Sequence, residues 1–138
     1  MKILNFQTQI ANALNTVDEL VQGGCKAFAE DSLSILRDVE TQLQQSSGVA
    51  IVVTTPRLNR SGCAADALPC DGALEIRCIE LPALNRDNTG NLTALDAAEI
   101  VAGALDGDEF NFSTIDQRID ERTGTITVTV SFNTSLYL

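Results

Sequence analysis

The sequence predicts an α+β fold, with a small mixed or antiparallel sheet packed by helices on one face, and three observations support this class. Apolar residues in the first third of the chain recur at spacings of three and four, as in amphipathic helices. The last third alternates apolar and hydroxyl-bearing residues, as in half-buried strands. The length of 138 residues and the hydrophobic fraction of 44% suit one packed domain, which we expect to span residues 1–138.

Two helices are expected to open this domain, as a pair within residues 7–45. The first stripe consists of Ile10, Leu14, Val17 and Val21. Gly23 and Gly24 follow it and predict its end. The second stripe consists of Leu33, Leu36, Val39 and Leu43, preceded by the N-cap candidates Asp31 and Ser32.

A sheet-and-helix core is expected over residues 48–138. Residues 49–54 (VAIVVT) are apolar on both faces and predict a buried strand. Residues 57–71 lack any period and are interpreted as a long loop, whereas residues 73–81 alternate and predict a second strand. The two strands and the loop between them form the first half of this core.

The second half of the core is expected to be a helix followed by a hairpin. Thr93 can cap a helix whose inner face is predicted to carry Leu95, Ala98, Ala102 and Leu105. An antiparallel hairpin is expected from residues 110–119 and 126–138, joined through residues 121–124. The chain closes with Leu136, Tyr137 and Leu138, apolar groups expected to dock into a neighbour or into the protein's own core.

The composition argues against an enzyme. The chain has no histidine, which removes the commonest general base, the Ser-His and Cys-His nucleophile pairs and most zinc sites. Cys63, Cys70 and Cys78 do not have zinc or redox spacing; buried or loop thiols are favoured, with a Cys63–Cys70 disulfide after release or a metal site as alternatives. No glycine-rich nucleotide loop is present. We therefore expect no catalytic residues, no metal and no cofactor.

The charge balance indicates which partners to expect. Nineteen acidic residues face nine basic ones, for a formal net charge of −10. Because gripping a phosphate backbone requires clustered cations, specific nucleic-acid binding is not expected. No stretch has the roughly 20 apolar residues of a membrane span, and no signal peptide is recognised, so a soluble protein made in the cytoplasm with reduced thiols is expected.

Two connected segments resemble a known family. They are residues 77–86 (RCIELPALNR) and residues 93–107 (TALDAAEIVAGALDG), separated by a glycine-containing turn and followed by the C-terminal hairpin. This arrangement is similar to that of the tail-terminator or tail-completion proteins of long-tailed bacteriophages. The similarity covers residues 48–138 in layout, and the opening helix pair is where the chain departs from it.

The resemblance implies a structural virion protein. Members of this family form a homo-oligomeric ring, usually a hexamer, that caps the tail tube and joins it to the head-neck connector. The implied partners are therefore further copies of the chain, the major tail tube protein and the connector protein, with DNA only passing through and no membrane contact. The implied location is the tail or neck of the virion, assembled in the host cytoplasm.

Three sets of residues are candidates for this role. An inter-subunit strand is expected from Ile126, Val128, Val130, Phe132, Leu136, Tyr137 and Leu138. An interaction loop is expected from Arg57, Leu58, Asn59 and Arg60. Acidic candidates for a DNA-repelling channel wall are Asp87, Asp106, Asp108, Asp116, Asp120 and Glu121, for which solubility alone is the plainer interpretation. Another neck, baseplate or minor tail component, or an unrelated protein-binding module, remains the alternative function.

Overall fold

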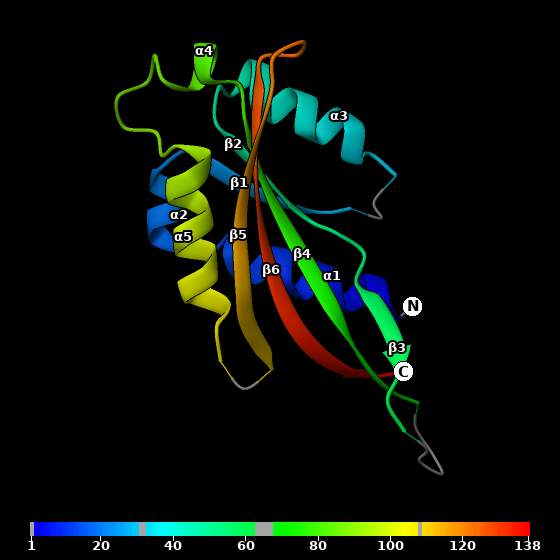
Figure 1. The fold of residues 1–138 in the computed structure, drawn as a ribbon. Coiled ribbons are helices and arrows are strands. Elements are labelled where there is room, and N and C mark those ends of the chain that lie inside the picture. The colour runs from blue at the N-terminus through cyan, green and yellow to red at the C-terminus, as the bar shows by residue number, and fades with distance from the viewer. Residues whose placement is uncertain (1, 31–32, 63–67, 108) are drawn as a thin grey trace.

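A computed structural model describes residues 2–30, 33–62, 68–107 and 109–138 (Figure 1). The chain forms a mixed sheet with the strand order β1-β2-β4-β6-β5, and β3 pairs with the first part of β4 beside β2. The strands are β1 (Cys25–Ala29), β2 (Val49–Val53), β3 (Arg57–Arg60), β4 (Pro69–Glu80), β5 (Phe110–Asp120) and β6 (Thr125–Tyr137). The predicted α+β class is confirmed.

Helices cover both faces of this sheet. The inner face, which carries the main core, packs against α1 (Lys2–Leu14), α2 (Asp18–Gln22) and α5 (Ala94–Leu105). On the other face, α3 (Ile35–Glu40) and the π-helix η1 (Thr41–Gln45) form the crossover from β1 to its parallel neighbour β2. A short α4 (Pro82–Asn85) follows β4. The expectation that helices cover one face alone was therefore wrong, because a parallel strand pair requires a crossover.

The expected N-terminal helix pair is interrupted by a strand. The first helix begins earlier than predicted, at Lys2, and its helical path breaks after Leu14 before α2 resumes at Asp18. Cys25–Ala29 then forms β1, directly after Gly24, whose φ of +80° is a conformation that favours glycine. The five residues CKAFA contain no β-branched side chain, so their strand character comes from pairing with β2.

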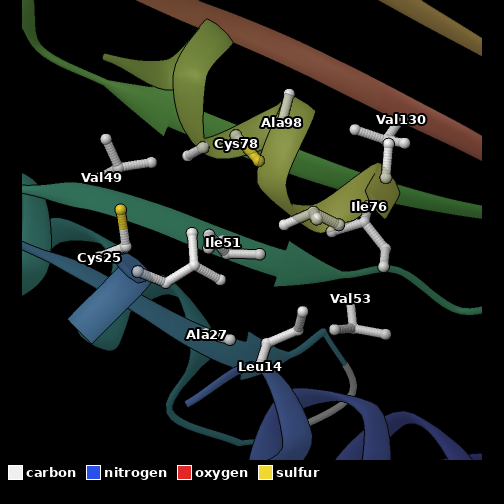
Figure 2. Close-up of a cluster of buried hydrophobic side chains, with 14 of the residues drawn as sticks. Leu14, Cys25, Ala27, Val49, Ile51, Val53, Ile76, Cys78, Ala98 and Val130 are labelled. Atoms are coloured by element: carbon white, nitrogen blue, oxygen red, sulfur yellow. The ribbon is translucent and has the colours of Figure 1, made fainter. Parts of the chain in front are cut away.

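The core is a single hydrophobic cluster between the inner face and the helices. Figure 2 shows β1, β2 and β4 contributing side chains to it, with Leu14 from α1 and Ala98 from α5. All five β2 residues are buried, as their apolar sequence predicted. Val128, Val130 and Phe132 on β6 are completely buried, so the alternation predicted for this strand is confirmed.

The inner side of α5 differs from the predicted stripe. Thr93 caps the helix as expected, accepting a hydrogen bond from the Asp96 amide at 3.1 Å. The buried residues are Ala94, Ala97, Ala98, Val101 and Ala102, whereas Leu95 is 41% exposed. Small side chains on the buried face let the helix lie close to the sheet, and a leucine there would hold it away.

Candidate assembly surfaces

The outer edge of β5 is the most open part of the sheet. This strand has 11 residues and pairs only with β6 within the described part of the chain. Phe110 and Ile115 are half-buried, and every other β5 side chain is exposed. Unpaired N–H and C=O groups along a strand edge can accept a strand from another chain. The exposed length makes this edge a candidate assembly surface.

The two ends of this edge differ. At its start, Phe112 donates its backbone N–H to Asp106 Oδ1 at 3.0 Å, and Gly107 donates to the Phe110 carbonyl at 2.8 Å. A register shift between Phe112 and Thr114 then marks a bulge. Residues 114–120 continue beyond this covered start as a regular strand. We define this stretch, Thr114–Asp120, as the β5 edge.

The opposite edge of the sheet, on β1, is closed by one side chain. Asn15, in the turn after α1, donates its amide to the Ala27 carbonyl at 3.0 Å and accepts the Ala27 N–H at 2.8 Å. Its side chain thus supplies both hydrogen bonds that a neighbouring strand would otherwise make at the centre of β1. With only five residues, β1 leaves little other backbone to pair.

A third edge is formed by β3, within the segment that was predicted to be a loop. Arg57–Arg60 pairs with Ala73–Cys70 of β4, and Arg57, Asn59 and Arg60 have exposed side chains, so the loop interpretation was wrong for these residues. Gly72 makes this pairing possible, since a Cβ there would lie 1.9 Å from the Arg57 carbonyl oxygen. Among the described residues, β3 has β4 as its one strand neighbour.

The predicted inter-subunit strand is not an edge. β6 lies between β4 and β5 and pairs with both, so the proposed strand edge over residues 126–138 was wrong (Figure 1). Its apolar residues serve the protein's own core, with Val128, Val130 and Phe132 buried and Ile126 half-buried. The chain end stays partly accessible: Leu136 and Leu138 are half-buried, and Tyr137 is 66% exposed. Sequence periodicity shows which face is apolar but carries no information on strand order.

The outer face of β4, β5 and β6 is an uncovered polar surface. It forms a shallow hollow lined by Thr114, Thr125, Thr127, Thr129, Ser131, Ile79, Ile119 and six charged residues: Glu75, Arg77, Asp116, Arg118, Asp120 and Glu121. Glu75 pairs with Arg77 at 3.6 Å, and Asp116 with Arg118 at 3.3 Å. Four carboxylates against two guanidinium groups leave this surface net acidic. We call it the outer sheet face.

The six acidic channel candidates do not all meet. Asp116, Asp120 and Glu121 line the outer sheet face. Asp106 lies beyond the other end of β5 at the Phe112 amide, and Asp87 is exposed after α4. Asp108 lies outside the described residues. The structure thus brings three of them together.

A buried carboxylate explains the role of the PALNR segment, residues 82–86 of the stretch noted in the sequence. Glu80 is completely buried at the end of β4, and its Oε1 accepts from Arg86 Nη2 at 3.0 Å and from the Ala94 amide at 3.2 Å. Its other oxygen accepts from the buried amide of Asn85, which also donates to the Leu92 carbonyl at 2.9 Å. These bonds tie the turn over residues 81–93 and the start of α5 to the sheet. The motif residues therefore act in folding, a role that sequence reasoning missed.

The cysteines in the described part of the chain are buried. Cys25, Cys70 and Cys78 are buried and unpaired by disulfides, and Cys63 lies outside the described residues. Burial raises the pKa of Cys25 to about 12, with a smaller contribution from the charge of Glu80. Burial also raises the pKa of Cys78 strongly. Both side chains therefore behave as small apolar groups in the core.

The described residues contain neither a metal-binding group of side chains nor a membrane-spanning helix. The structure has, in the ranges it describes, no group of three or more cysteine, aspartate or glutamate side chains placed to hold a metal ion. None of its described helices is long and apolar enough to cross a bilayer.

Comparisons with known proteins bear on the fold. Neither a protein-family model nor a curated protein matches the chain. Among solved structures, it is similar to a chain of the "Virion of native gene transfer agent (GTA) particle". The TM-score is 0.56 at 15% sequence identity, and the match covers 99% of this chain and 93% of that chain. At this identity the likeness establishes a shared fold over nearly the whole length of both chains.

Proposed function

We propose that this protein is a structural subunit of a phage-like virion, and that it acts as a tail-terminator-like ring subunit. The observation that carries this proposal is the fold shared with a chain of a gene transfer agent virion over 99% of the length. The PALNR and TALDAAE segments, whose resemblance to tail-terminator proteins was noted from the sequence, point the same way. In this role the ring caps the tail tube and joins it to the head-neck connector.

The surfaces support an assembly role. A ring subunit needs strand edges or faces that meet its neighbours, and the β5 edge and β3 provide two at different sides of the sheet. The outer sheet face offers a polar, net acidic wall without a covering helix over β5 and β6. Placed around a channel, such a wall repels DNA phosphates and lets the duplex slide.

Electron microscopy of the purified protein tests the ring. We expect rings with a central hole. Mass spectrometry of purified particles should find the chain in the tail or neck fraction. Absence of the chain from the particles would overturn the virion role. Localisation to a baseplate, or to a neck position away from the end of the tube, would retain the virion role and replace the terminator role.

A further inference from the structure

We propose that the β5 edge of one copy pairs with the β3 edge of a second copy, head to tail, so that the sheet continues from subunit to subunit. This inference rests on the proposed ring function for its closure, because repeated contacts between two different edges generate either a ring or an open filament. The partner is a second copy of this chain, and the contact joins Thr114–Asp120 to Arg57–Arg60.

Strand directions favour this pairing. β4 and β5 are both antiparallel to β6, so they run the same way, whereas β3 is antiparallel to β4. A neighbour that keeps the same sheet orientation therefore presents its β3 antiparallel to β5. Antiparallel ladders are the slightly more stable arrangement. The outer faces of successive copies then form one continuous wall.

Charge complementarity identifies the partner edge. Asp116 and Asp120 lie on the outer face of β5, opposite Thr129 and Thr125 of β6. Arg57 lies on the same outer face, because it pairs with Ala73, two residues before Glu75. Of the two arginines in β3, Arg57 shares this face, whereas Arg60 pairs with Cys70 and lies on the inner face. Opposite charges on facing strands stabilise the pair and select it over like-charged alternatives.

The other edge available to β5 is less suitable. β1 lies level with the β5 edge along the sheet, but Asn15 occupies the backbone groups of Ala27 at its centre. β3 lies further along, level with the start of β5, since its β4 partners Cys70–Ala73 pair with Asn133–Leu136 of β6. The pairing therefore requires the strands to be staggered and tilted, as closure of a barrel does in general.

Charge-swap variants test the pairing. Asp116→Arg with Asp120→Asn makes the β5 edge basic and keeps the side-chain oxygen at residue 120 that accepts the turn amides of Arg122 and Thr123. Arg57→Glu reverses the charge on β3 that faces the β5 edge. We expect each variant alone to weaken self-association about tenfold or more. An equimolar mixture of the two, and the chain carrying all three substitutions, should regain it.

Sedimentation velocity and native mass spectrometry measure the association, with thermal melting as the folding check. Asp87→Arg, which reverses an exposed charge away from both edges, is the matched control and should associate as wild type does. A wild-type chain that stays monomeric up to millimolar concentration overturns the inference. Rings that form equally well in all variants overturn the β5–β3 contact while leaving the ring function standing. Failure of the mixture to recover, with both variants folded, also overturns it. An Arg57→Glu variant that associates as wild type does, while the β5 variant does not, points to a symmetric β5–β5 contact and overturns it as well.

Discussion

The two outermost strands of the sheet, β1 and β5, differ in whether their outer edges are covered. β1 is five residues long, lies beside α1, and has its central residue, Ala27, hydrogen-bonded on the outer side by the side chain of Asn15. β5 is 11 residues long, almost wholly exposed, and pairs with β6 alone within the described ranges. Because the β5 edge lacks such protection, it is the edge at which we propose that a strand of another copy pairs.

A bulge and three charged side chains on β5 restrict which strands can pair with its edge. The bulge after Phe112 and the charges of Asp116, Arg118 and Asp120 discourage indiscriminate edge-to-edge aggregation. These charges also favour a basic partner strand, because only an opposite charge offsets the loss of hydration on pairing. The difference between the two edges therefore concerns specificity as well as accessibility.

The largest expected effect comes from breaking the strand that supports the open edge. Val130→Asp places a charge on the completely buried face of β6, next to Ile115 of β5, and should lower the free energy of unfolding by about 4 kcal/mol or more. Chemical denaturation measures it. Asn133→Asp, at an exposed position on the outer face of the same strand, is the matched control with a small effect. Unchanged melting of the Val130→Asp protein would contradict the face assignment.

The next effect tests the buried carboxylate that anchors α5. Glu80→Ala leaves the Ala94 amide, the Asn85 amide and Arg86 without their acceptor, and should destabilise the fold by about 3–5 kcal/mol. Glu75→Ala, which removes an exposed carboxylate on the same strand, serves as the control. If the two substitutions destabilise the protein equally, Glu80 does not have the anchoring role.

An intermediate effect comes from opening the closed edge. Asn15→Ala removes both hydrogen bonds to Ala27 and should lower the free energy of unfolding by about 1–3 kcal/mol. It should also increase aggregation, measured by light scattering, because β1 then becomes a second open edge. Asn12→Ala, an exposed change on α1, should do neither. An Asn15→Ala protein that aggregates no more than the control would show that α1 protects β1 without this side chain.

The smallest effect on folding is expected at the open edge itself. Asp116→Asn removes an exposed charge whose ion pair with Arg118 is worth little, so unfolding should change by less than about 0.5 kcal/mol. Self-association should nevertheless weaken. A large loss of stability would mean that Asp116 serves the monomer's fold and not its assembly.

Much of the fold was predictable in segments whose own residue pattern indicates which side chains are buried. β2 is apolar at every position and is buried at every position, and Val128, Val130 and Phe132 alternate as they pack. Thr93 caps α5 as its side chain and position predict. In these segments the local pattern and the tertiary environment agree.

The parts that the sequence did not predict depend on distant residues. CKAFA becomes β1 only because VAIVV lies beside it, and RLNR becomes β3 only because Gly72 lets the two backbones approach. The position of β6 between β4 and β5 removed it from the candidate edges and left β5 in its place. Strand order follows from long-range pairing, which periodicity along one strand does not encode.

Amide hydrogen exchange tests the comparison between the edges most directly. The protein is measured once at high dilution, as the monomer, and once at a concentration at which it is assembled. We expect the amides of residues 114–120 and 57–60 to gain protection on assembly, and those of residues 25–29 to keep the protection they already have. Assembly without any new protection at residues 114–120 would contradict the claim that the open β5 edge is where this protein meets its neighbours.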